Sequence, residues 1–138
     1  MQELIEKAIQ WGEERGIFEH SNPTKQLMKS ASELGEMFDA FAKEDWEQFK
    51  CETGDFIVTL ILLSEFARIP FFIRTRKEAT NDFSFHFLAE LHERMSYLMR
   101  FEVNSHSDFI YSFNSLLNCL GRLTDSINVS PEQCLALA

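Results

Sequence analysis

Apolar residues recur at helical spacing throughout residues 24–67, with one interruption near Glu44. In the first half they follow a three-four spacing on one face: Leu27, Ala31, Leu34, Phe38 and Phe41. Beyond the interruption, Asp45 can cap a second helix, with Gln48 three places on in the manner of a capping box. The pattern therefore predicts two long helices, ending at about Ala42 and about Ala67, that fold back on each other around Glu44.

The rest of the chain also has helical rather than alternating patterns. Residues 2–15 form the first expected helix, which stops at Gly16, a residue type favoured just after a helix. Ser21 to Thr24 form the start signal of the helix that ends near Ala42. Two later helices are marked by apolar series, one of Leu88, Leu91, Met95 and Leu98, the other of Phe109, Phe113, Leu116, Leu120, Leu123 and Ile127. We expect an all-α bundle of about five helices in a single domain over residues 1–138.

A further helix start lies near the end of the chain, at Ser130 to Gln133. It has a capping residue, Pro at the first helical position and an acid near the positive end of the helix dipole. Only Cys134 to Ala138 follow, and a helix this short is marginal alone. We expect this segment either to dock firmly or to lack residues that would naturally follow it.

Charge and composition exclude several classes of partner. The chain of 138 residues carries a net charge of −9, which argues against a nucleic-acid partner, because phosphate contacts need clustered Lys and Arg. The longest apolar run, Phe56 to Leu63, is too short to span a bilayer, although it needs cover on more than one side, which self-association would supply. The three Cys residues form no C-x-x-C pair. We expect a cytoplasmic protein with no membrane and no nucleic-acid partner.

Four carboxylates flank the expected turn at matching distances. Glu36 and Glu52 each lie eight residues from Glu44. Glu33 and Asp55 each lie eleven residues from it. At about 1.5 Å rise per residue, each pair lies at one height on antiparallel helices, and the spacing of three keeps the two acids of each helix on a shared face. All four carboxylates can therefore converge.

Such a cluster is open to two interpretations. Carboxylates gathered beside an apolar helix either take up protons, which raises their pKa values, or are neutralised by a cation, and their hard oxygen ligands suit Mg²⁺ or Mn²⁺. Alternatively, they belong to solvated helix faces, because an acidic protein contains many E-x-x-E coincidences. The symmetry about the turn favours the metal site.

At these residues the sequence resembles a known family. Residues 29–65, KSASELGEMFDAFAKEDWEQFKCETGDFIVTLILLSE, are similar to the helical core of MazG-like nucleoside triphosphate pyrophosphohydrolases, an all-α group with the signature E-E-x-x-E followed by E-x-x-D. Residues 10–29, QWGEERGIFEHSNPTKQLMK, look like the segment that precedes this signature in phage and mobile-element members. Residues 129–138, VSPEQCLALA, look like the beginning of their last helix.

The resemblance implies a site and an activity. It makes Glu33, Glu36, Glu52 and Asp55 the metal ligands and catalytic residues, with Mg²⁺ as cofactor and Mn²⁺ as a substitute. The implied reaction is hydrolysis of a nucleoside triphosphate to the monophosphate and pyrophosphate, with deoxynucleotides as the preferred substrates. This activity would control unwanted or excess nucleotides. Magnesium would neutralise and orient the triphosphate and activate water. Homodimers or homotetramers would complete the nucleotide pocket.

Two departures from the family pattern bear on this reading. Ser32 replaces the first Glu of E-E-x-x-E, which we interpret as the loss of a supporting acid. Family members usually continue the last helix into a basic segment that holds phosphates, whereas the sequence here stops at Ala138. If that segment is absent, either Lys29 or the segment from Arg74 to Lys77 would have to substitute for it, or catalysis would be weak.

Two residues are candidates for substrate binding. Lys29 lies one helical turn before Glu33, where it can contact phosphate or form an intrahelical ion pair. Trp11 can stack on a nucleobase or serve as a packing residue. The rival to an enzyme is a helical nucleotide-binding or assembly module without turnover. The absent basic segment favours that module, and the four carboxylates favour the enzyme, because burying them without a cation is unfavourable.

Overall fold

The computed structural model describes residues 1–76, 84–100 and 106–138. In these residues the chain forms helices joined by turns and extended segments, with no strand. The helices are α1 (Gln2–Glu14), α2 (Ile17–His20), α3 (Pro23–Ala42), α4 (Trp46–Ala67), α5 (Ser84–Leu98), α6 (His106–Ser126) and α7 (Pro131–Ala136). The predicted all-α class is confirmed, and none of the described helices is long and apolar enough to cross a membrane.

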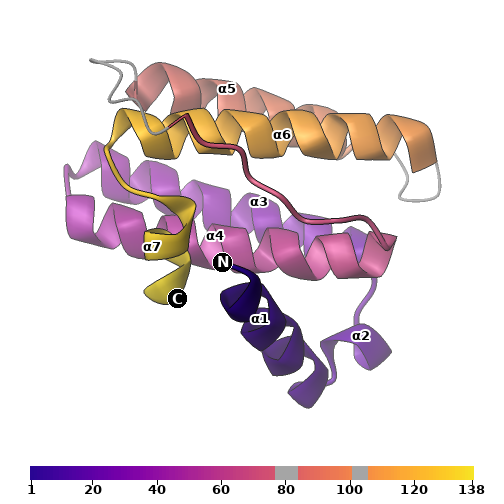
Figure 1. Cartoon of the computed structure of the whole chain (residues 1–138). Helices are drawn as coiled ribbons and strands as arrows, with labels where there is room; N and C mark the ends of the chain where they lie inside the picture. The colour runs from indigo at the N-terminus through magenta and orange to yellow at the C-terminus, as the bar shows by residue number, and fades with distance from the viewer. Residues whose placement is uncertain (77–83, 101–105) are drawn as a thin grey trace. The chain divides into compact units, whose positions relative to one another are not determined.

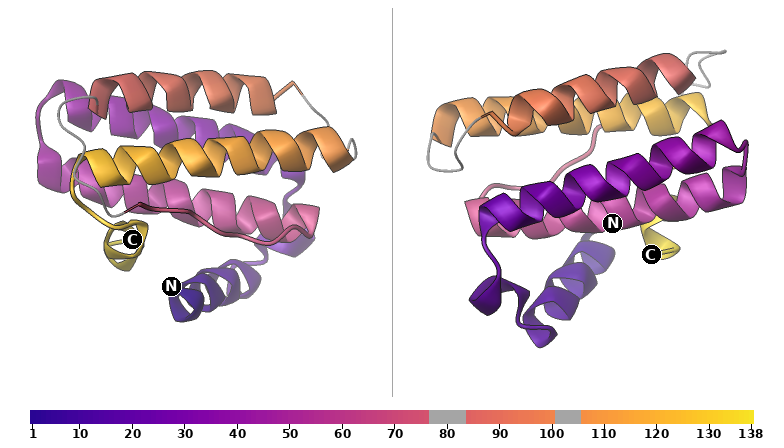
Figure 2. Two further views of the ribbon diagram at one scale, coloured as in Figure 1. Left: turned by 45° about the horizontal axis from the view of Figure 1, so that its top comes forward. Right: turned by 180° about the vertical axis from the view of Figure 1, so that it is seen from behind.

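The chain divides into two compact units, and the single domain over residues 1–138 stays a prediction. One unit comprises Met1–Phe71 together with Glu132–Ala138, and the other comprises Phe72–Pro131. The first unit therefore contains α1 to α4 and nearly all of α7, and the second contains α5 and α6. Figures 1 and 2 show the helices of each unit.

The helical hairpin predicted around Glu44 is present as α3 and α4, which lie antiparallel and side by side in Figures 1 and 2. The side chain of Asn22 accepts a hydrogen bond from the Lys25 N–H and caps α3. The side chain of Asp45 accepts one from the Gln48 N–H and caps α4. Between them Glu44 has φ 54°, so the chain reverses through a left-handed residue.

Only half of the predicted capping box forms at the start of α4. The Asp45 side chain makes its bond, but the Gln48 side chain does not return to the Asp45 N–H, which donates instead to the carbonyl of Ala40. Gln48 donates through Nε2 to a carboxylate oxygen of Glu52, one turn further along α4. The residue is therefore engaged at the carboxylates rather than at the helix end.

The core of the first unit is centred on α4, which is apolar on most of its faces. From α3 the fully or nearly buried apolar residues are Leu27, Leu34, Met37 and Ala40. A buried hydrogen bond of 3.0 Å from Gln26 Nε2 to the Thr59 carbonyl joins the two helices. Within the run Phe56 to Leu63 only Val58 is not buried, so the run gives no argument for self-association.

The remaining helices of the first unit contact α4. Helix α1 buries Ile5, Ala8 and Gly12, and α2 places Phe18 with its ring centre 5.1 Å from that of Phe66. The sequence did not predict α2. Gly16 ends the preceding helical segment as expected, but its φ of 70° lets the chain enter a new helical turn at once.

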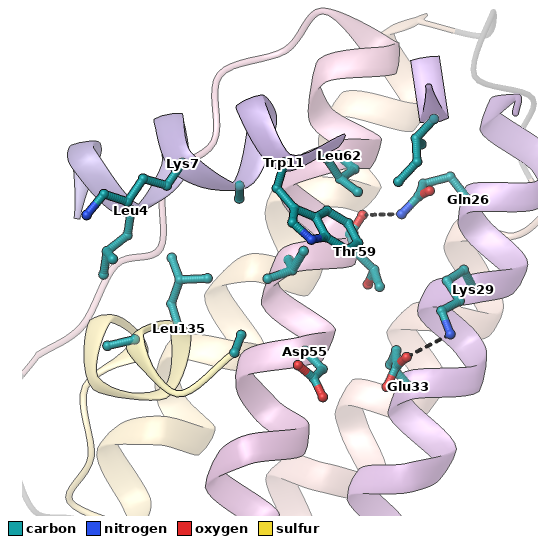
Figure 3. Close-up of a pocket in the computed structure, with 15 residues that line it drawn as sticks. Leu4, Lys7, Trp11, Gln26, Lys29, Glu33, Asp55, Thr59, Leu62 and Leu135 are labelled. Atoms are coloured by element: carbon teal, nitrogen blue, oxygen red, sulfur yellow. Dashed lines mark hydrogen bonds and ion pairs between the residues drawn. The ribbon is translucent and has the colours of Figure 1, made fainter. Parts of the chain in front are cut away.

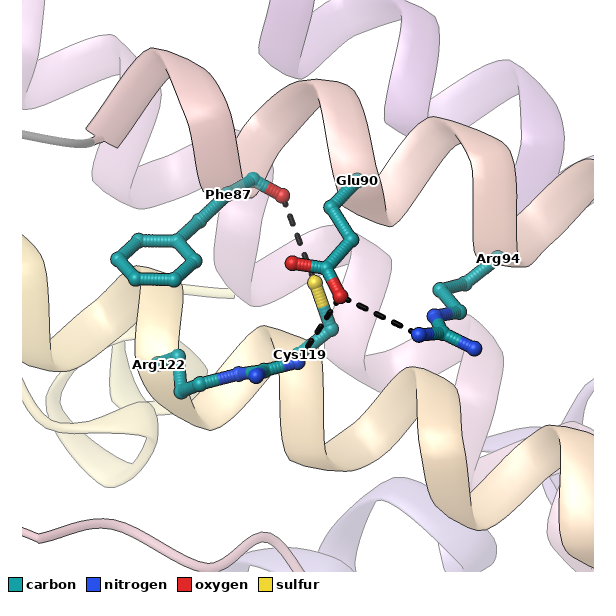
Figure 4. A network of polar contacts seen from close by, with 5 residues as sticks. All are labelled: Phe87, Glu90, Arg94, Cys119 and Arg122. Carbon is teal, nitrogen blue, oxygen red and sulfur yellow. Dashed lines mark hydrogen bonds and ion pairs between the residues drawn. The ribbon is translucent and has the colours of Figure 1, made fainter.

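The second unit is an antiparallel pair of helices with its own core. Helix α5 buries Leu88, Leu91, Met95 and Leu98. Figure 4 shows Glu90 between two guanidinium groups, 3.3 Å from that of Arg94 and 3.1 Å from that of Arg122. Beside it the buried Cys119 thiol donates to the Phe87 carbonyl at 3.5 Å, and burial raises its pKa to about 11.

An extended segment precedes α5 and lies against α6. It carries Arg74 and Arg76 of the segment that was considered as a substitute for the family's basic segment, whereas Lys77 lies outside the described residues. The Arg76 N–H donates to the Asp125 carboxylate at 2.8 Å. The Arg74 carbonyl occupies the space where a side chain at Gly121 would begin, so only glycine permits this close approach.

Candidate metal centre

Three carboxylates from the hairpin form one group. Glu33 comes from α3, Glu52 and Asp55 come from α4, and one oxygen from each lies within 4.8 Å of the others. Glu33 and Glu52 are half-buried and Asp55 is partly exposed. Glu36, the fourth predicted ligand, is exposed and lies outside the group. The structure thus brings together three of the four predicted carboxylates.

Each glutamate of the group is contacted by the residue one turn before it. The Nζ of Lys29 lies 3.0 Å from Oε1 of Glu33, which is the intrahelical ion pair allowed by the sequence. The Glu33 side chain is 15% exposed and that of Lys29 is 61% exposed, so the ammonium reaches the carboxylate from the solvent side. Gln48 donates to Glu52 in the same way along α4. The i, i+4 spacing of this second pair is visible in the sequence, but we did not predict it.

The pKa of Asp55 shows that negative charge is in excess in the group of three carboxylates. Its pKa is raised, first by burial and then by the neighbouring charges of Glu33 and Glu52, while the Lys29 ammonium acts in the opposite direction. One lysine therefore does not neutralise three clustered carboxylates. The site has an excess of negative charge that either a proton or a cation relieves.

The donor set fits a hard divalent cation. Carboxylate oxygens are the ligands that Mg²⁺ prefers, at about 2.0–2.1 Å, so that opposite oxygens of its octahedron are about 4.2 Å apart. The separations of up to 4.8 Å between oxygens of Glu33, Glu52 and Asp55 require only small side-chain movements to meet this geometry. Mg²⁺ usually keeps several waters, which suits a site with three protein ligands.

A pocket of about 720 Å³ adjoins the carboxylates, within the size range of small-molecule sites. Figure 3 shows Glu33 and Asp55 at one side of it, and Lys29 and Trp11 among the other lining residues. All residues that line it belong to the first unit: Leu4, Lys7, Ala8, Trp11, Ile17, Gln26, Lys29, Glu33, Asp55, Val58, Thr59, Leu62, Leu135, Ala136 and Ala138. Both predicted substrate-binding residues therefore lie in the same pocket as two of the predicted metal ligands.

The two tryptophans differ in their surroundings. Trp11 is 42% exposed, lines the pocket and has the Arg15 guanidinium carbon 4.7 Å from its ring centre. Trp46 is 46% exposed and packs edge-on against Phe41, away from the pocket lining. Trp11 is thus the tryptophan that a ligand in the pocket would meet.

Sequence reasoning missed other parts of this pocket. Lys7 lines it one turn before Trp11, and this i, i+4 relationship was a usable signal. Leu135 and Ala136 of α7 also line it. No pattern in the sequence indicates that contact, because these residues lie about eighty positions from Asp55 and only the folded chain brings them to it.

Comparison with known proteins finds one distant likeness. Over 65 residues the chain is 35% identical to an uncharacterised 18.2 kDa protein from the rep-hol intergenic region of Haemophilus phage HP1. That stretch is 47% of this chain and 40% of the phage protein, so the chain spans less than half the length of its relative. No protein-family model and no solved structure matches the chain.

Proposed function

We propose that the protein is a magnesium-dependent nucleoside triphosphate pyrophosphohydrolase, acting first of all on deoxynucleotides. One observation carries the proposal: Glu33, Glu52 and Asp55 converge beside a pocket that also contains Lys29 and Trp11. A metal-bound nucleotide would need oxygen ligands for the cation, a positive side chain for the phosphates and an aromatic ring for the base. The resemblance to MazG-like enzymes supports the same assignment.

The reaction is hydrolysis of the anhydride bond between the α- and β-phosphates. Bound Mg²⁺ would supply charge neutralisation of the triphosphate and activation of water. Glu33, Glu52 and Asp55 would hold the ion, and Mn²⁺ would suit the same oxygen ligands. Water attacks the α-phosphorus, the bond to the β-phosphate oxygen breaks, and a carboxylate of the cluster accepts the water proton. The products are a nucleoside monophosphate and pyrophosphate.

Lys29 is the candidate for phosphate binding. Its ammonium is largely exposed and, within the part of the chain that the structure describes, forms an ion pair with the Glu33 carboxylate alone. When Glu33 serves as a metal ligand, the long Lys29 stem can turn its charge towards a phosphate in the same pocket. Arg74, the start of the other candidate segment, belongs to the second unit and does not line this pocket.

Trp11 and the apolar part of the pocket are the candidates for nucleobase binding. The ring is exposed, and Leu4, Ala8 and Leu62 contribute apolar surface to the same lining. Base stacking on an aromatic ring is tolerant of base identity, because every base has a π-face. This arrangement supports binding of nucleotides as a class without selecting one base.

Self-association follows from the resemblance, and location follows from the cysteine pattern. We place the enzyme in the cytoplasm, because its three Cys residues form no C-x-x-C pair. We expect a homodimer or homotetramer, because the family resemblance points to assemblies that complete the nucleotide pocket. The burial of Phe56 to Leu63 within one chain removes the independent argument from that run. Light scattering on the purified protein would measure the assembly directly, and a monomer that is fully active would overturn this part of the proposal.

The test is pyrophosphate release from each canonical dNTP and NTP with Mg²⁺. We expect one pyrophosphate per monophosphate from the wild type, and a fall in kcat of at least about 100-fold in Asp55→Asn, because a metal ligand is lost. Asp39→Asn is the matched control: it removes one negative charge from α3 at a residue paired with Lys43. It should keep the activity of the wild type.

Each outcome of this test has a meaning. Equal activity in wild type and Asp55→Asn would remove the carboxylate group from the reaction. No release by a folded protein that is nevertheless stabilised by Mg²⁺ and a nucleotide would identify the rival function, a nucleotide-binding module without turnover. A protein that responds to neither ligand would leave an assembly module as the better assignment.

A further inference from the structure

The short helix α7 forms one wall of the carboxylate pocket. Leu135 and Ala136 line the pocket together with Asp55 of α4, as Figure 3 shows for Leu135 and Asp55. A helix of six residues is not stable by itself, so contacts with the rest of the first unit must hold α7 in place.

Gly54 is the residue over which α7 passes. A Cβ atom at Gly54 would overlap with the carbonyl group of Cys134, which is backbone and cannot rotate away. Cys134 is fully buried and Leu135 is 5% exposed. An ion pair also joins α7 to the beginning of α1, where the amino group of Met1 lies 3.2 Å from the Glu132 carboxylate. The backbone of α7 therefore lies directly on α4 at a position where only glycine leaves room.

We propose that Gly54 is a positioning residue for the nucleotide. Because it has no side chain, α7 can pack directly on α4, an arrangement called the seated state below, and this packing completes the pocket beside Asp55. The inference rests on the proposed function for the identity of the ligand. The metal ligands themselves all lie on α3 and α4. Displacing α7 therefore weakens nucleotide binding while leaving the cation site intact.

Seating of α7 and occupation of the pocket are coupled. A ligand that contacts Leu135 or Ala136 binds better when α7 is seated, and by linkage its binding favours the seated state by the same factor. The coupling gives the inference a readout that does not depend on catalysis, namely how often α7 leaves α4 with and without a nucleotide.

The chain offers a matched pair of substitutions. Gly54→Ala and Gly35→Ala each add one methyl group in the interior of a hairpin helix, and each raises the helix propensity in the same direction. A Cβ at Gly35 has no heavy atom within 4 Å, whereas a Cβ at Gly54 meets the α7 backbone. A difference between the two variants therefore reports the contact with α7.

Cys134 provides the direct readout of α7. Its thiol is buried, and burial raises its pKa to about 11, so it should be nearly unreactive while α7 is seated. We would measure alkylation of Cys134 by iodoacetamide with peptide mass spectrometry, with the buried Cys119 of the second unit as internal reference. Cys134 should react at least about tenfold faster in Gly54→Ala than in wild type or Gly35→Ala, because an opened state exposes the thiol.

The nucleotide arm uses the α,β-imido analogues of the four dNTPs with Mg²⁺, one at a time. At least one analogue should slow alkylation of Cys134 in the wild type, through the coupling described above. Unchanged alkylation in Gly54→Ala would overturn the seating role of Gly54. Faster alkylation in Gly54→Ala without protection of the wild type by any analogue would overturn the link to nucleotide binding.

Kinetics separate positioning from general damage. Gly54→Ala should raise the KM for the nucleotide by about tenfold or more and leave kcat within about threefold, with the stabilisation by Mg²⁺ alone unchanged. A fall in kcat as large as the rise in KM, together with a loss of the stabilisation by Mg²⁺, would overturn the proposal. If the wild type releases no pyrophosphate, the proposed reaction fails, yet the alkylation experiment still decides the role of Gly54 in binding.

A second variant covers the case in which Gly54→Ala does not fold. Leu135→Ala leaves α4 unchanged and removes apolar surface from α7 where it is buried against the first unit. It should show the same pattern: faster alkylation of Cys134, a higher KM and an unchanged response to Mg²⁺. Circular dichroism of each variant establishes that the helices remain, and a folded Leu135→Ala with wild-type alkylation and KM would contradict the inference.

Discussion

The Lys29 ammonium and the Glu33 carboxylate form an ion pair of 3.0 Å at the edge of the three-carboxylate group. The same lysine lowers the pKa of Asp55, against the larger effects of burial and of the other carboxylates. Lys29 therefore occupies, with a single charge, a carboxylate that a divalent cation would take. In the proposed enzyme it is also the candidate for binding the phosphates, because it lines the same pocket.

Replacing Lys29 by Met should have opposite effects on the two ligands. Loss of the ammonium removes a competitor for Glu33, so affinity for Mg²⁺ without nucleotide should rise by about two- to fivefold, as expected for a partly exposed charge. The KM for the nucleotide should rise by about tenfold or more, because a phosphate contact is lost. Calorimetric titration with Mg²⁺ and steady-state kinetics measure the two effects.

The control for this substitution is Lys43→Met. Lys43 makes the same kind of i, i+4 ion pair, with Asp39 at 2.9 Å, on the same side of the hairpin turn but outside the carboxylate group. It should change neither Mg²⁺ affinity nor KM. If Lys29→Met weakens Mg²⁺ binding, Lys29 supports the site rather than competing with the metal.

Asp55→Asn should stabilise the metal-free protein at neutral pH. The substitution removes the carboxylate whose charged form is disfavoured by burial and by its neighbours. It should also abolish the response to Mg²⁺. For the wild type, Mg²⁺ at ten times its Kd adds about 1.4 kcal/mol, which is about 4 °C in Tm for a chain of this size. Thermal melting with and without Mg²⁺ measures both effects.

The pH dependence of this effect has a definite sign. Because the folded pKa of Asp55 is raised above the ordinary value of 3.8, the folded state keeps its proton longer than the unfolded state. The stability that protonated Asp55 allows is fully present below pH 3.8 and is lost as pH rises through the folded pKa. The Tm advantage of Asp55→Asn without metal should therefore grow over that window and then level off. An advantage that shrinks as pH rises would contradict the charge repulsion.

Glu36→Gln distinguishes the family pattern from the observed geometry. The family pattern makes Glu36 a ligand equal to the others, whereas its side chain is exposed and outside the group of three. We expect Glu36→Gln to keep most of the Mg²⁺ response and to lower kcat by about tenfold or less, and Glu33→Gln to lose both. Equal losses in the two variants would place Glu36 among the ligands in the metal-bound state.

Gln48→Ala tests the support of Glu52. The Gln48 amide holds one oxygen of the Glu52 carboxylate, and partners of this kind orient metal ligands. We expect about a tenfold loss in Mg²⁺ affinity with unchanged helical content. Gln10→Ala is the matched control, because Gln10 donates to Glu14 at 2.9 Å with the same i, i+4 spacing but on α1. Similar losses in both variants would point to a general effect of such pairs on the protein.

The sequence predicted the hairpin well because local chemistry specifies it. Asn22 and Asp45 each accept a backbone hydrogen bond at a helix start. Asp45 was predicted as a cap, and Asn22 lies within the predicted start signal from Ser21 to Thr24. The short helix α2 was not readable, because Gly16 is equally compatible with a helix end and with the start of a new turn. Local patterns specify where helices begin more reliably than where the chain turns next.

In the candidate site, too, some features were predictable from the sequence and others were not. Placing Glu33 near Asp55 required only the helical rise and the position of the turn, and the structure brings them together. Glu36 has an equally symmetric position, yet its side chain stays in solvent. Height along a helix follows from counting residues, but the direction in which a side chain points also depends on how the two helices are rotated against each other.

From the sequence alone came the all-α class, the hairpin and the carboxylates that it presents, because helical periodicity, caps and spacing are properties of neighbouring residues. Only the tertiary structure decided which three carboxylates meet and that Trp11 and α7 line the pocket beside them. These features depend on contacts between distant residues, such as that of Gly54 with Cys134, and on the packing of side chains against each other. No local pattern carries that information, since it arises only when the chain has closed on itself.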